Sequence, residues 1–315
     1  MNPSPQSRFR RPGPILLAAL LGAIPALAAD YLGFDVNNAI IPAKEILRGG
    51  PPRDGIPSID RPKFIAPGQA RFMREDDLVL SLTAGNETRA YPLRILVWHE
   101  IVNDTFGGQP VAVTYCPLCG TAMVFDRRYG GRELTFGVSG LLFQSDVLMY
   151  DRQTETLWSQ LGLKAVAGKL VGQDLIWLPA EHLKWKIWRA KYPRGQVLSN
   201  DTGYDRDYSN LPYGGYESSP RTMFPVPQPR KELPTKEWII GIIVNGKAKA
   251  YPQATLPSDT TVEDVVDGVP LRLTFDRQTG SFSALRLDTG DAIPFTQAYW
   301  FAWQAFYPAT DLWTK

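Results

Sequence analysis

The sequence is poor in the residues that most often carry chemistry or stabilise a fold covalently. Its 315 residues include two cysteines and two histidines, and 34 lysines plus arginines stand against 32 aspartates plus glutamates. Two cysteines cannot form the framework of a disulfide-stabilised scaffold. The near-balanced charge offers no basic stripe for phosphates, so we expect no nucleic-acid partner and no nucleotide cofactor. With two histidines as the available bases, a serine hydrolase is not expected either.

Long apolar runs are also scarce. The most apolar stretch, residues 15–24, is shorter than the roughly 18 residues that a membrane-spanning helix needs. It follows three arginines at positions 8–11 and precedes the small residues Ala26-Leu27-Ala28, which is the layout of a secretory signal peptide. We therefore predict a cleaved signal at residues 1–28, a periplasmic or secreted protein, and no membrane span after cleavage. Without the three arginines, 31 basic residues face 32 acidic ones.

What the sequence does contain is an internal similarity. Displaced by 160 residues, the segment 77–121 lies over 237–281 without a gap, and ten of the 45 positions are identical. A second echo matches 188–193 with 303–308 at a displacement of 115. The two displacements differ by 45 residues, so the first copy should carry an insertion of about that length within 121–170.

These patterns predict an α+β, β-rich fold made of two internally duplicated strand-helix lobes. We expect one helix near residues 180–191, which would place His182 on a solvated face. The predicted segments are the signal peptide (1–28), an N-terminal extended arm (29–76), lobe 1 with the cysteine turn and the insertion (77–208), a Pro-rich connection (209–236) and lobe 2 (237–315).

The two copies differ most at one turn. After the strand that ends near Tyr115, the first copy reads Cys116-Pro117-Leu118-Cys119-Gly120, whereas the second reads Asp276-Arg277-Gln278-Thr279-Gly280. The second copy makes this turn without sulfur, so the cysteines are not needed for the turn itself. Function should therefore be sought at residues 116–120.

One interpretation of the turn is a metal site. A Cys-Pro-x-Cys-Gly turn can present two thiolates to one ion, with Cys116 as principal ligand and Cys119 as second. A second cysteine pair is missing, so His99 and Met123 are the residues that could complete the site, with Met149 or a carboxylate as further options. This soft ligand set predicts copper, with zinc as the less favoured ion.

Other interpretations stay open. The pair could be a thiol-disulfide oxidoreductase centre, although such centres normally begin a helix and this turn precedes an apparent strand at residues 122–125. The cysteines could also be buried thiols or a local disulfide, and His99 a core or capping residue. Alternatively the protein is a non-catalytic binding module whose insertion grips an unknown periplasmic ligand or protein, so enzyme activity is not assigned. Residues that could line such a pocket over the turn are Glu100, Ser139, Ser145, Asp146 and Gln160.

Several motifs together resemble a known family. Segment 113–121 contains Tyr-Cys-Pro-Leu-Cys-Gly-Thr, and segment 148–154 contains Met-Tyr-Asp-Arg-Gln-Thr. The other two segments are 137–142 and 157–160. From about residue 77 to 313 the chain is similar to domain-of-unknown-function family 3179, which groups exported bacterial and archaeal proteins without an established activity. Because some relatives carry Thr in place of Cys119, the resemblance implies that Cys116 is the functional sulfur and Cys119 an accessory.

Overall fold

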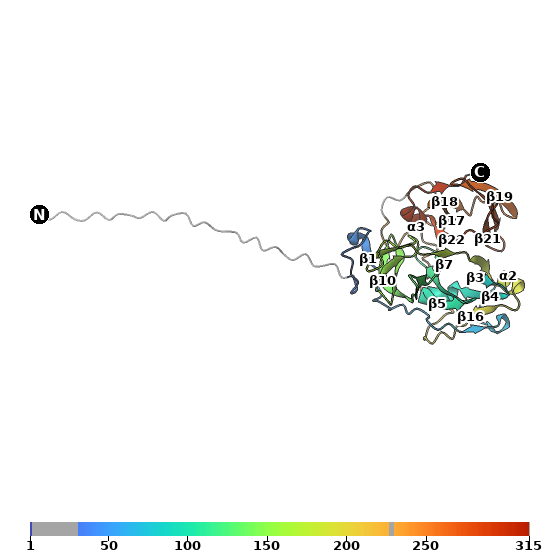
Figure 1. Cartoon of the computed structure of the whole chain (residues 1–315), viewed down its shortest axis with the longest axis horizontal. Coiled ribbons are helices and arrows are strands. Elements are labelled where there is room, and N and C mark those ends of the chain that lie inside the picture. The colour runs from blue at the N-terminus through green and yellow to red at the C-terminus, as the bar shows by residue number, and fades with distance from the viewer. Residues whose placement is uncertain (2–30, 227–229, 315) are drawn as a thin grey trace. The chain divides into compact units, whose positions relative to one another are not determined.

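Strands dominate the chain, as a computed structural model shows (Figure 1). The structure describes residue 1 and residues 31–226 and 230–314, so the predicted signal peptide lies outside the described residues except for Met1. The predicted β-rich α+β fold is confirmed. Three short α-helices occur among the described residues, and none of the described helices is long and apolar enough to cross a membrane.

The elements follow one another in a regular order along the chain. The helices are η1 (Ala43–Glu45), η2 (Pro67–Gln69), α1 (Leu93–His99), α2 (Trp185–Lys191) and α3 (Trp300–Phe306). The strands of the first two-thirds are β1 (Ile46–Arg48), β2 (Phe64–Ile65), β3 (Leu78–Ala84), β4 (Glu87–Pro92), β5 (Ile101–Phe106), β6 (Gln109–Cys116), β7 (Thr121–Asp126), β8 (Arg128–Tyr129), β9 (Arg132–Glu133), β10 (Phe136–Phe143), β11 (Asp146–Asp151), β12 (Leu157–Ser159), β13 (Lys164–Ala167), β14 (Trp177–Leu178), β15 (Glu181–Lys184) and β16 (Gln196–Leu198). The remaining strands are β17 (Trp238–Val244), β18 (Lys247–Pro252), β19 (Thr260–Val266), β20 (Val269–Asp276), β21 (Ser281–Arg286), β22 (Phe295–Tyr299) and β23 (Asp311–Leu312).

The two similar segments have the same strand order. In the first, β15-β3-β4-β16 form part of one sheet and β7-β6-β5 part of another; in the second, β22-β17-β18-β23 and β21-β20-β19 form the corresponding sheets. The correspondence extends to register, because β4 pairs β16 in parallel through Arg89 and Gln196, and β18 pairs β23 in parallel through Lys249 and Asp311. Arg89 and Lys249 are related by the displacement of 160 residues, and Gln196 and Asp311 by the displacement of 115.

The two segments also contact each other reciprocally. Strand β22 lies against β7, and β15 lies against β21. The backbone N–H of Tyr299 donates to the carbonyl of Cys119 at 2.8 Å, and the N–H of Lys184 donates to the carbonyl of Thr279 at 3.3 Å. The β6–β7 turn of the first segment is therefore bonded by β22, which precedes α3. The β20–β21 turn of the second segment is bonded by β15, which precedes α2.

The extra residues of the first segment build a sheet of their own. Strands β8 to β14 lie between β7 and β15, and β10, β11, β12 and β13 form a sheet with β1 at its edge. The inward side chains of this sheet, such as Met149 and Trp158, share one apolar core with Cys116, Met123 and the C-terminal helix residue Trp303. The insertion thereby becomes one wall around the cysteine turn.

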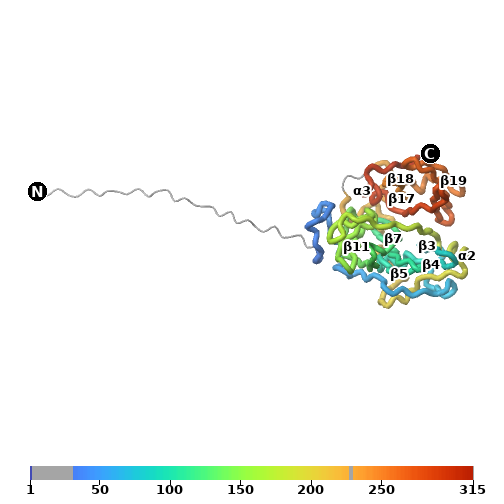
Figure 2. Tube along the Cα trace, in the orientation of Figure 1, coloured from blue at the N-terminus to red at the C-terminus, as the bar shows by residue number. Residues whose placement is uncertain are grey.

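The segment before β3 lies along the outside of these sheets (Figure 2, blue). Strand β1 pairs with β10, and β2 pairs with β16. Between them, Ile59 forms an isolated parallel bridge with Val102 of β5. The short strands and bridges give the Pro- and Gly-rich sequence enough backbone partners to stay extended across three sheets.

One predicted helix is wrong over its first part. Residues 181–184 form β15, which pairs with β3, and α2 starts only at Trp185. His182 is therefore not on a solvated helix face; it lies on a strand, is 4% exposed, and packs its ring against Phe295 at 4.9 Å. Pairing with β3, about 100 residues earlier, overrides the local helical pattern.

A matched pair of glycines tests the contact between the two segments. Gly120 has φ +69° and a Cβ there would meet the Trp238 ring at 2.5 Å, whereas Gly280 has φ +71° and its nearest neighbour is Lys184 Cγ at 3.9 Å. Both substitutions by Ala carry the cost of a left-handed backbone, about 1 kcal/mol. We expect Gly120→Ala to cost about 2–4 kcal/mol in total, because overpacking adds to the backbone cost.

Urea unfolding of the two variants measures the difference directly. Gly280→Ala is the control for the backbone cost, and the excess loss in Gly120→Ala reports packing of the turn on Trp238. Equal losses in both variants would contradict the contact.

Candidate functional site

The cysteines sit at the two ends of the turn that joins β6 to β7. The carbonyl of Cys116 accepts the N–H groups of Cys119 at 3.2 Å and Gly120 at 2.9 Å. The second segment makes the same turn, where Gly280 N–H donates to the carbonyl of Asp276 at 2.8 Å. The cysteine turn lies between two strands, as the sequence indicates, and its backbone form does not depend on sulfur.

Both thiols are free and buried. Cys116 is 2% exposed and Cys119 is fully buried. Their sulfurs face the same backbone carbonyl, that of Ser145, at 3.9 Å from Cys116 Sγ and 3.2 Å from Cys119 Sγ. The two sulfurs thus converge on one point of the inserted sheet.

Ser145 reaches the sulfurs because of an unusual turn between β10 and β11. Gln144 and Ser145 have φ of +52° and +68°, the pair of positive values that a tight I′-type hairpin requires. Such turns normally use Asn or Gly, since other residues pay about 1 kcal/mol each for a left-handed backbone. The side-chain hydroxyl of Ser145 is not directed at the sulfurs and donates instead to the carbonyl of Phe224 at 3.3 Å.

Asp146 follows this turn and completes a three-residue cluster. One carboxylate oxygen and the two sulfurs lie within 4.8 Å of one another, and all three residues are buried. Asp146 Oδ2 accepts the N–H of Leu161 at 2.9 Å, and Oδ1 lies 3.2 Å from Thr121 Oγ1. We call Cys116, Cys119 and Asp146 the thiol-carboxyl site; its three side chains could together bind a metal ion.

Glu100 is a second buried carboxyl close to this site. It follows α1 with a φ of +57° and ψ of −31°, a backbone conformation that non-glycine residues rarely adopt. Its side chain is 7% exposed. Burial, together with the nearby Asp146 carboxyl, raises the pKa of Glu100 to about 8.

Burial also favours the protonated forms of the other acids of this region. It raises the pKa of both the Cys116 and the Cys119 thiol and raises that of Asp146 to about 6. Neither Asp146 nor Glu100 forms an ion pair within the part of the chain that the structure describes. Four acidic groups therefore share an interior region without a protein cation to balance them.

His99 has hydrogen-bond partners of its own. The Nδ1 atom of His99 lies 2.7 Å from the carbonyl of Pro57, and Nε2 lies 2.6 Å from the hydroxyl of Tyr208. Both ring nitrogens have these partners, and His99 as a metal ligand stays a prediction. The alternative of a satisfied core histidine fits this geometry.

The remaining predicted site residues, Met123, Gln160 and Ser139, have different relations to the thiol-carboxyl site. Met123 shares a buried core and a strand face with the site, two residues beyond Thr121 on β7. Gln160 contacts Thr121, the neighbour of Asp146, and not the sulfurs. Its Oε1 lies 2.7 Å from Thr121 Oγ1, and its Nε2 donates to Thr114 Oγ1 at 2.7 Å. Ser139 donates to the carbonyl of Leu148 inside the inserted sheet, and therefore has a structural partner there.

Part of the predicted Pro-rich connection (209–236) covers the site. In residues 209–224, here the cover segment, Tyr216 donates to the carbonyl of Leu118 at 3.0 Å, and the carbonyl of Phe224 accepts from Ser145. The one signal for such a role is the run of tyrosines at 204, 208, 213 and 216, which is unusual in a linker.

Comparison with known proteins identifies a family. Neither the comparison with curated proteins nor that with solved structures found a match. The model of one family, described as protein of unknown function (DUF3179), matches residues 53–310. This stretch contains the cysteine turn, Glu100, the inserted sheet, the cover segment and nearly all of the second similar segment. The chain therefore belongs to the DUF3179 family.

Proposed function

We propose that the protein holds one thiophilic metal ion at the thiol-carboxyl site. The supporting observation is that Cys116, Cys119 and Asp146 place two sulfurs and a carboxylate oxygen within 4.8 Å of one another in a buried region. Ionising these groups in the interior without a counter-charge is costly, which is why their pKa values are raised. A bound cation would replace the protons and supply the missing positive charge.

The donor set supports zinc over the copper that the sequence predicted. The expectation of copper relied on His99 and Met123, and His99 is bound to Pro57 and Tyr208. Two thiolates plus a carboxylate suit Zn²⁺, which binds sulfur and oxygen ligands together, whereas Cu(I) favours an all-soft set. Glu100 or the Ser145 carbonyl is the donor that could fill a fourth position.

The site supports holding an ion more than exchanging disulfides. A reactive thiol needs a lowered pKa and access to its partner, but burial raises the pKa of both Cys116 and Cys119. The turn leads into strand β7 and not into a helix whose N-terminus would stabilise a thiolate. Closed sites of this kind are typical of structural or storage metals. We further infer from residues 1–28 that the protein acts outside the cytoplasm.

A titration of metal-free protein with Zn²⁺ tests the proposal. At pH 7 both thiols are protonated and Asp146 is largely ionised, because its pKa is about 6. We expect one ion per chain and release of about two protons per ion, measured by calorimetry in buffers of different ionisation enthalpy. A parallel titration with Cu(I) under reducing conditions should show weaker retention against a chelator. No saturable binding of either ion would refute the proposal, and tighter retention of Cu(I) would restore copper.

A further inference from the structure

A second candidate site lies on the opposite side of the β6–β7 hairpin from the sulfurs. A cavity of about 660 Å³ opens there, and Tyr115 and Ala122, which alternate with Cys116 and Thr121 along the strands, line it. We call it the junction pocket, because corresponding positions of the two similar segments face each other across it. The corresponding lining pairs are Leu78 and Trp238, Leu93 and Gln253, Pro117 and Arg277, Gly120 and Gly280, and His182 and Gln297.

The pairs that differ give the pocket its chemistry. Where the first segment has Leu78 and Leu93, the second contributes the indole of Trp238 and the amide of Gln253. Pockets at the junction of two similar units, lined by aromatic groups and a few polar ones, are the usual setting of small-molecule sites. The size of this cavity is within the range of roughly 300–1,000 Å³ that such sites have.

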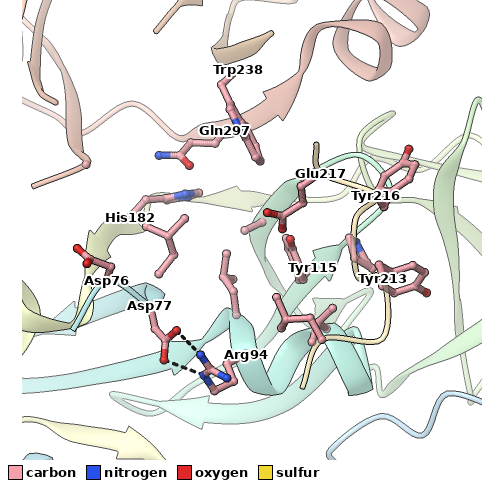
Figure 3. A pocket seen from close by; sticks show the side chains of 18 of the residues that line it. Asp76, Asp77, Arg94, Tyr115, His182, Tyr213, Tyr216, Glu217, Trp238 and Gln297 are labelled. Atoms are coloured by element: carbon pink, nitrogen blue, oxygen red, sulfur yellow. Dashed lines mark hydrogen bonds and ion pairs between the residues drawn. The ribbon is translucent and has the colours of Figure 1, made fainter. Parts of the chain in front are cut away.

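Three polar side chains of the lining are at least nine-tenths buried and lack protein partners. His182 is 4% exposed and its Nε2 atom makes no hydrogen bond. Tyr115 and Gln297 are each 8% exposed, and neither side chain hydrogen-bonds another described residue, while Gln253 Nε2 is a second buried nitrogen without a partner. In Figure 3 these side chains and Trp238 surround the open centre of the pocket, and the dashed lines join only Asp77 and Arg94. Buried polar groups are almost always hydrogen-bonded, so the unpartnered nitrogens of His182 and Gln253 at one cavity indicate a ligand.

The charges around the pocket favour a ligand without negative charge. The cations of the lining are occupied: Arg94 pairs with Asp77 at 2.6 Å, Lys184 with Asp76 at 3.3 Å, and Arg277 donates to the carbonyl of Leu256 at 2.8 Å. Glu217 lies at the pocket with its carboxylate towards Tyr115 (Figure 3). The carboxylate oxygens of Glu217 can accept hydrogen bonds from a ligand, and their negative charge would repel an anion.

We propose that the junction pocket binds a small neutral polyhydroxylated molecule of the class of mono- and disaccharides. Each hydroxyl group both donates and accepts, as do the Tyr115 hydroxyl, the Gln297 amide and a neutral imidazole. His182 is in that neutral form because burial lowers its pKa to about 3. The apolar face of a sugar ring can pack on the Trp238 indole, which gives contact area that a linear polar ligand lacks.

Direct binding of defined sugars tests the proposal. Saturation-transfer NMR and calorimetry would be run with glucose, N-acetylglucosamine and maltose, and with glucuronate as the anionic counterpart. We expect saturable binding of at least one neutral sugar with a Kd below about 10 mM, and weaker binding of glucuronate than of glucose. No saturable binding of any neutral sugar, or tighter binding of glucuronate, would overturn the proposal.

Two conservative variants locate the binding. Tyr115→Phe and Gln297→Leu remove polar groups that have no protein partner, so each should leave the melting temperature unchanged or higher while weakening sugar binding at least tenfold. Gln278→Ala, an exposed glutamine of the same segment outside the lining, is the control and should bind normally. Unchanged affinity in both pocket variants overturns the assignment. The result is independent of metal content, which is measured on the same samples.

Discussion

Raising the pH from 6.5 to 8 should lower the free energy of unfolding of the metal-free protein by about 1 kcal/mol. The cause is Glu100, whose pKa is raised from its ordinary value of 4.5 to about 8 by burial and by Asp146. In the folded protein Glu100 keeps its proton over most of this range and is half ionised at its upper limit, whereas in the unfolded chain it has already lost the proton. Stability from such a group is fully present below the unfolded pKa and is lost as the pH rises through the folded pKa.

The window limits the contributions of other groups. Burial lowers the pKa of His182 to about 3 and also lowers that of His99, so both residues make stability rise slightly as the pH increases from 6.5, against the larger effect of Glu100. Asp146, with a pKa of about 6, has nearly finished titrating at the lower limit. The two thiols, whose pKa values are raised above 9.0, contribute only at more alkaline pH.

Chemical denaturation in the presence of a chelator and a reductant measures this dependence. The matched variant is Glu100→Gln, which keeps the shape of the side chain and cannot ionise. Its stability should be flat or rise slightly between pH 6.5 and 8, because the two buried histidines remain, and the wild-type loss should disappear. A wild-type protein that is equally stable at both pH values, or more stable at pH 8, would contradict the assignment of a buried protonated Glu100.

Cys116→Ser should weaken zinc binding by more than about 100-fold, since loss of an outer-shell partner already costs 10–100-fold and this change removes a ligand. A serine hydroxyl is a poor replacement because it does not ionise near neutral pH and binds Zn²⁺ weakly. The substitution is small and the turn keeps its backbone hydrogen bonds, so the fold should survive. Competition with a chromophoric chelator measures the affinity, and circular dichroism checks the fold.

His99→Gln is the informative comparison for that experiment. The sequence pattern made His99 a ligand, but its ring bonds Pro57 and Tyr208, so zinc affinity should stay within about threefold of wild type. A large loss in His99→Gln with little loss in Cys116→Ser would reverse the ligand assignment. Cys119→Thr adds a second comparison, because the family resemblance implies that Cys119 is an accessory and should cost less than Cys116.

Local sequence patterns predicted the strands and the cysteine turn correctly, because those features depend on neighbours in the chain. The turn at 116–120 and its counterpart at 276–280 have the same glycine conformation, with φ near +70° in both. The repeated apolar segments at 78–82 and 238–242 likewise predicted the β-rich class. The predicted helix at 180–191 failed over residues 181–184 because β15 gains its backbone partners from β3, and no local pattern records that pairing.

The composition of the site depended on longer distances. Asp146 reaches the sulfurs through a turn at Gln144 and Ser145, which both have positive φ. Gln and Ser rarely adopt this conformation, so the sequence does not predict the turn. The hydrogen-bond partner of His99 Nε2 is Tyr208, which lies 109 residues later and which no local pattern indicates. Glu100 was a candidate only by its place next to His99; its raised pKa follows from burial, which becomes visible once the chain is folded.

The hydrogen bonds between the cysteine hairpin and the last strands have a consequence for the order of events during folding. The hydroxyl oxygen of Thr296, 174 residues after Ala122, accepts the N–H of Ala122, and the N–H of Tyr299 donates to the carbonyl of Cys119. Until these late residues arrive, the thiols stay open to oxidants and to free metal ions. An ion loaded before closure would then be trapped by slow local unfolding, so its exchange rate would report the opening of the C-terminal segment and not the strength of the metal–sulfur bonds.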